Sequence, residues 1–193
     1  MTKPSIPIKC VIVGDKGVGK TCLFLACTNT WPPDYHIPKA CGAHLSSVIV
    51  DNKSVNLSLW DSCHPNYDRT LSFPETDVFL LCYASRRNLT NIKERWISQI
   101  SYHCPGAPFL LIRTRSDIID DEILMELGLE QKWDPPISRR EGNKIADQLG
   151  AHKHMACSPL NQDGLEELID EAVRAGLSHR KSKSKSLFSS FFS

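Results

Sequence analysis

The chain has 193 residues, of which 41% are hydrophobic and 23% charged, and its formal net charge is +1. This composition predicts one soluble globular domain with a sizeable core. The small net charge argues against a general nucleic-acid-binding surface, and no apolar run approaches the ~18 residues of a membrane-spanning helix. The eight cysteines include no C-x-x-C pair, and no signal peptide precedes them. We therefore expect free thiols in a reducing compartment rather than disulfides or a metal site.

The first predicted elements are a buried strand at residues 8–13, a glycine-rich loop and a helix at 21–28. Residues 14–21 read GDKGVGKT and match the pattern G-x-x-x-x-G-K-[ST]. In such a loop, glycines let backbone N–H groups turn toward phosphate oxygens, and the helix that follows directs its positive end at the same anion. Lys20 would reach the terminal phosphates, and the Thr21 hydroxyl would bind Mg²⁺. We predict phosphate binding by Asp15, Lys16, Gly17, Val18, Gly19, Lys20, Thr21 and Cys22.

Apolar runs alternate with helical periodicity along the rest of the chain. Strands are expected at 46–50 and 55–60, on either side of a hairpin turn, and at 78–84, 109–112 and 155–157. Helical spacing of apolar residues predicts helices at 91–103, 138–149 and 163–177, and Ser138 with Glu141 forms a capping-box pattern. Alternating strands and helices predict an α/β fold with a mainly parallel sheet, whose ligand lies at the carboxyl ends of the strands.

Polar residues follow three of these predicted strands. Asp61 ends the run at 55–60, a place that suits a carboxylate holding Mg²⁺ through water. By itself an aspartate there is more typical of a turn, but the glycine-rich loop favours the metal interpretation. Residues 114–117 read TRSD after one strand, and residues 157–160 read CSPL after the last.

The order and spacing of these motifs resemble those of small GTPases, in which T/N-K-x-D and S-A-L/K motifs recognise guanine. Residues 8–11, 20–23, 55–57, 67–69 and 76–80 resemble the Rho/Rac branch, and residues 120–134 resemble its helical insert. The resemblance covers about residues 6–177. It implies a P-loop G domain over residues 1–177, with a six-stranded, mainly parallel sheet and about five helices besides the insert helix. The implied ligands are GTP or GDP with Mg²⁺. The implied metal contacts are Thr21 and Asp61, and the implied guanine contacts are Thr114, Arg115, Asp117, Ser158, Pro159 and Trp31.

Several residues depart from the family pattern around the phosphates. Lys16 stands where the family has glycine, and its side chain would obstruct the attacking water and an arginine finger, offset phosphate charge, or point into solvent. Lys39 replaces the threonine that binds Mg²⁺, although lysine has no acceptor for a metal. Pro65 replaces the glutamine that orients water, and it has neither amide group nor N–H. His64 is more consistent with a solvated loop residue than with a replacement base, so we assign no catalytic residue.

The guanine pocket and the effector loop also differ. Arg115 replaces a lysine that packs along the base, and Pro159 replaces an alanine whose N–H donates to guanine O6. Asp117, which would accept from guanine N1–H and the 2-amino group, is retained. Residues 40–44 lack the bulky and acidic pattern that the usual effectors recognise.

Three functions stay open. The first is an atypical Rho-like GTP-binding switch or adaptor, with weak or absent GTP hydrolysis, that acts through protein effectors and regulators. The second is a pseudo-GTPase scaffold that does not need nucleotide, and the third is an ordinary cycling GTPase in signalling and cytoskeleton regulation. The retained phosphate loop favours the first over the second, whereas Lys39 and Pro65 count against the third.

Residues 178–193 form a basic tail followed by aromatic residues. The last cysteine is Cys157, so we expect neither prenylation nor tail palmitoylation. Cations and aromatic rings in this order would bind an anionic membrane surface, and a disordered tail is the alternative. We expect a cytoplasmic protein, peripheral at the inner face of the plasma membrane. The tail residues expected to touch it are Arg180, Lys181, Lys183, Lys185, Phe188, Phe191 and Phe192.

Overall fold

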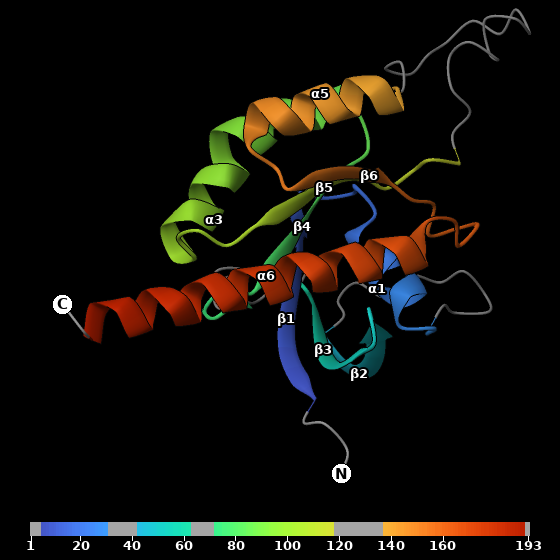
Figure 1. Cartoon of the computed structure of the whole chain (residues 1–193). Coiled ribbons are helices and arrows are strands. Elements are labelled where there is room, and N and C mark those ends of the chain that lie inside the picture. Colours follow the sequence, from blue (N-terminus) through green and yellow to red (C-terminus); the bar gives the residue numbers. More distant parts are fainter. Residues whose placement is uncertain (1–4, 31–41, 63–71, 118–136, 192–193) are drawn as a thin grey trace, which may run out of the picture.

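The computed structural model describes residues 5–30, 42–62, 72–117 and 137–191, with side chains through Lys185. A six-stranded sheet with the order β2-β3-β1-β4-β5-β6 forms its centre (Figure 1). β2 runs antiparallel to β3, and every other neighbouring pair is parallel. The predicted α/β class with a six-stranded, mainly parallel sheet is confirmed. The strands are β1 (Ile6–Gly14), β2 (Ala43–Val50), β3 (Lys53–Asp61), β4 (Val78–Tyr83), β5 (Phe109–Arg113) and β6 (Lys153–Ala156).

Helices pack on both faces of this sheet. α1 (Lys20–Cys27) and α6 (Leu165–Phe191) share one core with the sheet, while α3 (Ile97–His103) and α5 (Arg139–Leu149) belong to the core of the other face. The helix expected at 91–103 begins earlier, as α2 (Arg86–Asn91), and continues through a π-helical turn, η2 (Ile92–Trp96), into α3. The expected insert at 120–134 lies outside the described residues.

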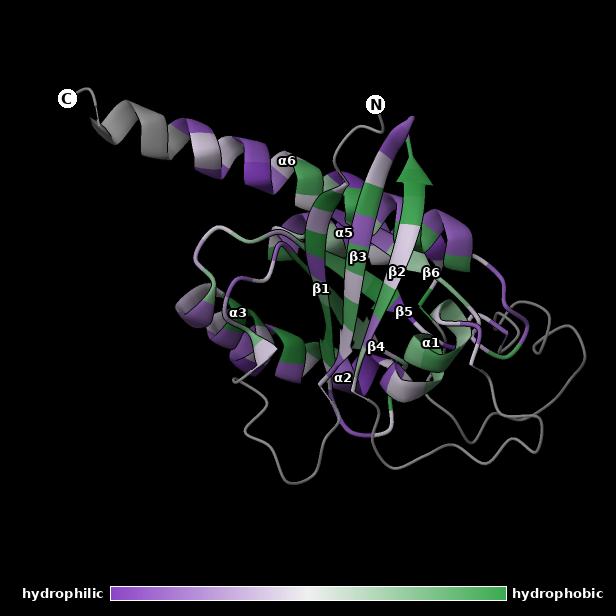
Figure 2. Ribbon diagram, turned by 90° about the horizontal axis from the view of Figure 1, so that it is seen from below, coloured by the Kyte–Doolittle hydropathy of each residue, from purple (hydrophilic) through white to green (hydrophobic). Residues whose placement is uncertain are grey.

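β1 shows how the sheet divides the core in two. Ile8, Cys10 and Ile12 pack on the side of α1 and α6, whereas Val11 and Val13 pack on the side of α3 and α5. Because both faces are covered, β4 and β5 are buried along their whole length. β3, nearer the edge of the sheet, alternates between buried and exposed residues, and its colours alternate in Figure 2. The loops at the ends of the strands are therefore left to carry the polar residues of a site.

α6 is longer than the sequence pattern predicts. It begins at Leu165 but continues beyond residue 177 to Phe191, and so extends past the sheet (Figure 1). No proline or glycine follows Gly176, and the Ser182 and Ser184 hydroxyls donate to carbonyl oxygens three residues earlier. Arg180 Nε donates to Asp77 Oδ1 at 2.7 Å and holds the helix to the start of β4. None of the described helices is both long and apolar enough to cross a membrane.

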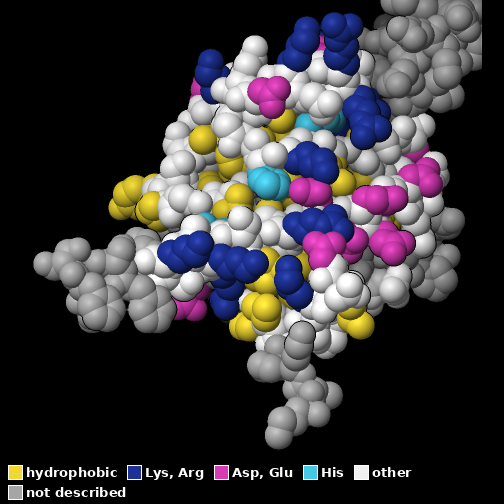
Figure 3. Space-filling model, in the orientation of Figure 1, with side chains coloured by type: hydrophobic (Ala, Val, Ile, Leu, Met, Phe, Trp, Pro, Cys, Tyr) yellow, Lys and Arg dark blue, Asp and Glu magenta, His cyan; other side chains and the backbone are white. Residues whose placement is uncertain are grey.

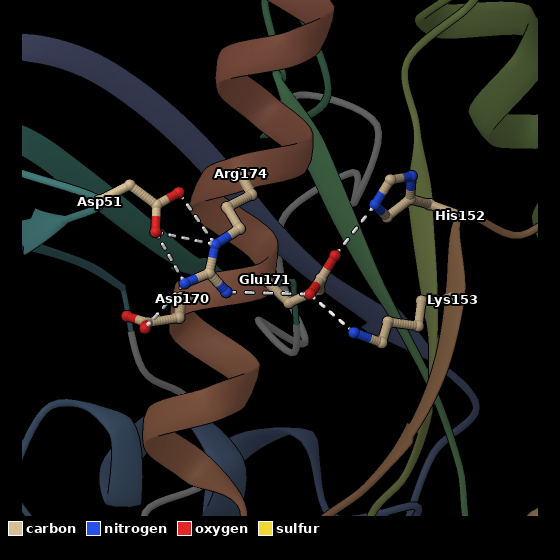
Figure 4. A network of polar contacts seen from close by, with 6 residues as sticks. All are labelled: Asp51, His152, Lys153, Asp170, Glu171 and Arg174. Atoms are coloured by element: carbon tan, nitrogen blue, oxygen red, sulfur yellow. Dashed lines mark hydrogen bonds and ion pairs between the residues drawn. The ribbon is translucent and has the colours of Figure 1, made fainter. Parts of the chain in front are cut away.

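A polar network joins α6 to both edges of the sheet, at the turn between β2 and β3 and at the start of β6 (Figure 4). Arg174 donates to Asp51, in the turn between β2 and β3, at 3.0 Å and 3.1 Å. Glu171 accepts from Lys153 Nζ at 2.8 Å and lies 3.1 Å from His152 Nε2, both at the start of β6. Most of these side chains are exposed, so the network orients α6 more than it stabilises the fold.

Candidate functional site

The loop between β1 and α1 has a backbone that only glycine accommodates. Gly14 has a φ of 141°, and a Cβ there would lie 2.4 Å from the carbonyl oxygen of Cys82 in β4. Gly19, the N-cap of α1, has a φ of 89°. Since side chains disfavour these conformations, the glycines of the motif are required by the path of the chain. The loop lies at the carboxyl ends of the parallel strands, where the sequence predicts the ligand.

Lys20, Thr21 and Asp61 meet at the start of α1. Lys20 is 2% exposed, and its Nζ donates to the carbonyl oxygen of Asp15 at 2.6 Å. The Thr21 hydroxyl donates to Asp61 Oδ2 at 2.8 Å, and Asp61 is itself buried. A hydroxyl beside a carboxylate is an oxygen pair of the kind that Mg²⁺ prefers. These residues therefore fit the predicted metal.

Asp117 and Ser158 form a second part of the site, at the ends of β5 and β6. Ser158 is fully buried, and its hydroxyl donates to Asp117 Oδ1 at 2.7 Å. The same hydroxyl oxygen accepts from the backbone N–H of Asn161 at 3.2 Å. Pro159 is also buried and supplies no N–H to this pocket. Trp31, the remaining predicted contact to a base, lies outside the described residues.

Two side chains connect this second part to the glycine-rich loop. The Thr114 hydroxyl donates to the carbonyl oxygen of Val18, and Arg115 Nη2 donates to that of Gly17 at 3.3 Å. Arg115 thus contacts the glycine-rich loop, although it replaces the lysine of the guanine-recognition motif. The structure brings together the residues predicted from 15–22, 61, 114–117 and 158–159.

The residues that depart from the family pattern are described only in part. The Lys16 side chain is exposed, and its predicted effects on the attacking water and on phosphate charge stay predictions. Lys39, His64 and Pro65 lie outside the described residues, so their predicted effects stay predictions.

The Asp15 carboxylate has partners that the sequence pattern did not reveal. It accepts hydrogen bonds from Asn88 Nδ2 at 3.2 Å, Asn91 Nδ2 at 2.9 Å and Trp96 Nε1 at 3.0 Å. Burial opposes the charge of Asp15, but the hydrogen bonds from Trp96 and the asparagines outweigh it and hold the pKa of this carboxyl below its ordinary value. The spacing of Trp96 predicted only a core position. No local signal pairs these donors with a residue more than 70 positions earlier.

A comparison with protein families adds an independent finding. The family model described as "Ras family" matches residues 9–178 of this chain. The match spans the glycine-rich loop, Asp61, Asp117 and Ser158, and it includes all of the parts that the structure brings to one edge of the sheet.

Proposed function

Because this chain belongs to the Ras family, whose members are small GTPases, we propose that it is an atypical, Rho-like member that binds GTP or GDP with Mg²⁺ and hydrolyses GTP weakly or not at all. The observation that carries the proposal is the attachment of the phosphate loop to the Asp117 segment through Arg115 and Thr114. Through these contacts, the loop that would bind phosphates and the segment that would bind a base are held in a fixed relative position.

The phosphate end of the site retains Lys20, Thr21 and Asp61. Lys20 is held within the loop by Asp15, and a cation there would attract the terminal phosphates. Thr21 and Asp61 would hold Mg²⁺, which supplies positive charge to the phosphate oxygens. Family members generally bind their nucleotide with this ion, and the oxygen pair supports the same for this chain.

Hydrolysis is expected to be weak because two groups that the reaction uses are replaced. Lys39 cannot ligate Mg²⁺ as the family's threonine does, and Pro65 cannot orient a water molecule as glutamine does. Intrinsic hydrolysis in this class is slow even with both groups present. The protein would therefore remain in its GTP-bound form after exchange and act on protein partners as a switch or adaptor.

Base recognition rests on Asp117 and Ser158. The carboxylate of Asp117 is held by Ser158 at 2.7 Å, which leaves its acceptors oriented for the guanine N1–H and 2-amino groups. Pro159 removes one N–H donor to guanine O6, and a missing partner typically costs ~1–3 kcal/mol, or roughly ten- to a hundredfold in affinity. We expect guanine specificity with reduced affinity.

The purified protein provides the direct test. After denaturation, the released nucleotide is identified by chromatography: GTP supports a locked switch, GDP indicates residual hydrolysis, and no nucleotide supports a scaffold. Multiple-turnover hydrolysis at the rate of an ordinary Rho protein would refute weak hydrolysis.

A substitution of Asp117 tests base recognition separately. D117N should change the base preference from guanine to xanthine, because an amide group can donate to the xanthine 2-oxo group, whereas a carboxylate repels it. D147N is the matched control, since Asp147 is exposed on α5 and its substitution removes the same charge away from the site. Equal GTP affinity in D117N and D147N would contradict the assigned role.

We also propose that the end of α6 contacts an anionic membrane surface, such as the inner face of the plasma membrane. Lys181, Lys183 and Lys185 are exposed, and Figure 3 shows basic side chains gathered beside the grey C-terminal end of the helix. Arg180 is paired with Asp77, so the three lysines are the better candidates for this contact. Each would contribute about 1 kcal/mol near an anionic leaflet.

Vesicle co-sedimentation tests this contact. Binding to phosphatidylserine-containing vesicles should fall in K183E/K185E but persist in K93E/K144E, which changes two exposed lysines elsewhere by the same charge. Equal binding by both variants, or binding to neutral vesicles alone, would refute an electrostatic contact of the tail.

A further inference from the structure

Asp15 places a carboxylate in a loop that is built to hold anions. Its pKa below the ordinary value keeps it charged at neutral pH, and like charges at close range in a partly buried site repel strongly. A carboxylate free to turn toward the phosphates would weaken such a loop. The surrounding structure therefore has to hold this group in place.

One short segment supplies the groups that do so. Asn88 and Asn91 donate to Oδ2 of Asp15, and Trp96 donates to Oδ1, at 2.9 Å to 3.2 Å. Trp96 is fully buried, whereas Asn91 is exposed. Hydrogen bonds to a charged acceptor are stronger than neutral ones, so three together fix both oxygens of the carboxylate.

The backbone of this segment departs from a regular α-helix in the turn that ends at Trp96. Residues Ile92–Trp96 form the π-helical turn η2, which adds a residue to the turn and changes the direction of the side chains that follow. Such turns are rare and concentrate at functional sites. Here the irregular turn ends on the residue whose indole N–H reaches Asp15.

Asn88 is in turn fixed by the end of β4. Its Oδ1 accepts from the backbone N–H groups of Ala84 and Ser85 at 3.1 Å and 3.0 Å, so its amide group is left pointing at Asp15. On the other side of the loop, Lys20 Nζ donates to the Asp15 carbonyl oxygen. A continuous chain of contacts thus runs from β4 through Asp15 to the lysine of the phosphate loop.

We propose that Asn88, Asn91 and Trp96 are positioning residues that hold Asp15 and thereby keep the phosphate loop in the conformation that retains a nucleoside diphosphate or triphosphate. They act through Asp15 rather than by touching the ligand. The inference rests on the proposed nucleotide binding, and it adds residues outside the loop that set how long the nucleotide stays bound.

Dissociation of methylanthraniloyl-GDP, followed by fluorescence in excess GDP with Mg²⁺, tests the inference. N91A removes one donor from an exposed position and should speed dissociation by roughly three- to tenfold. N91D sets a second carboxylate against Asp15 and should exceed the effect of N91A. D15N/N91D exchanges donor and acceptor across this contact but sets the new amide against Asn88, which donates to the same oxygen of Asp15. It should therefore release the nucleotide more slowly than N91D without reaching the rate of the unmodified protein.

Matched controls separate this role from folding and from the proposed function. T90A, an exposed position on the same helix, should leave the rate unchanged. The ³¹P resonance of the GDP β-phosphate should shift in N91D and move part of the way back in D15N/N91D, which a general loss of stability would not produce. If the unmodified protein binds no GDP, the proposed function fails. If it binds GDP and all variants release it at the same rate, the positioning role is refuted while nucleotide binding stands.

Discussion

His154 is a buried neutral base whose protonation should limit stability in mild acid. The side chain, in β6, is 6% exposed, and its Nε2 lies 2.9 Å from the Tyr83 hydroxyl. Gly142 of α5 packs so closely that a Cβ there would be 2.2 Å from the ring. Burial, with repulsion from Arg113 and Arg139, lowers the pKa of His154 to about 4.

The size of the effect follows from the two pKa values. The unfolded chain binds a proton near pH 6.5, its ordinary value, but the folded chain binds it only near pH 4. Stability is therefore complete above pH 6.5 and is lost as the pH falls toward 4. At about 1.4 kcal/mol per pH unit the limiting loss is about 3 kcal/mol. At pH 4.5 the limit is not reached, because the folded protein already binds part of its proton there, so we expect about 2 kcal/mol.

Urea unfolding at pH 7.5, 6.5, 5.5 and 4.5 measures this loss by comparison with H154Q. Glutamine retains a hydrogen-bonding group for Tyr83 but cannot titrate, and all other groups are shared by the two proteins. The difference in the free energy of unfolding should shift by about 2 kcal/mol in favour of H154Q as the pH falls. Parallel pH profiles, or an NMR titration of the folded protein that puts the pKa of His154 above 6, would refute the reasoning.

Two further predictions concern the replaced residues Lys39 and Pro65 and the end of α6. K39T/P65Q restores a metal ligand and a water-orienting amide, so single-turnover GTP hydrolysis should rise by at least roughly tenfold; an unchanged rate would show that other residues limit the reaction. R180Q removes the cation that pairs with the Oδ1 atom of the buried Asp77, which should cost about 1–2 kcal/mol. Amide hydrogen exchange in the last turns of α6 should then accelerate, and K183Q should exchange like the unmodified protein; equal protection in both variants would contradict the anchoring role.

The sheet was predictable from the sequence because local patterns determine it. Continuous apolar runs such as β1 and β4 indicate strands covered on both faces, and the glycine-rich loop marks the junction where the chain turns from strand to helix. Asp61 was singled out because it directly follows a predicted strand, whereas Asp117 was singled out by the resemblance of residues 114–117 to a guanine-recognition motif. Parallel topology then brings these strand ends together.

Contacts between distant segments could not be predicted in this way. The donors to Asp15 come from a segment whose periodicity indicates an ordinary buried helix face, and the irregular turn at η2 leaves no mark in that periodicity. The length of α6 was underestimated because its apolar spacing weakens after Leu177. Within the continuation, Arg180 reaches Asp77 across the fold, a pairing that sequence separation conceals.

Because α6 is continuous, it also determines how far its end extends from the domain. From Lys181 to Phe191 the helix rises by about 15 Å, at about 1.5 Å per residue. A flexible chain of the same length would let the domain tumble freely about its attachment, because its ends sample many separations. A helix held at Arg180 is stiff, so a surface that binds its far end would fix both the distance and the tilt of the proposed nucleotide site relative to that surface.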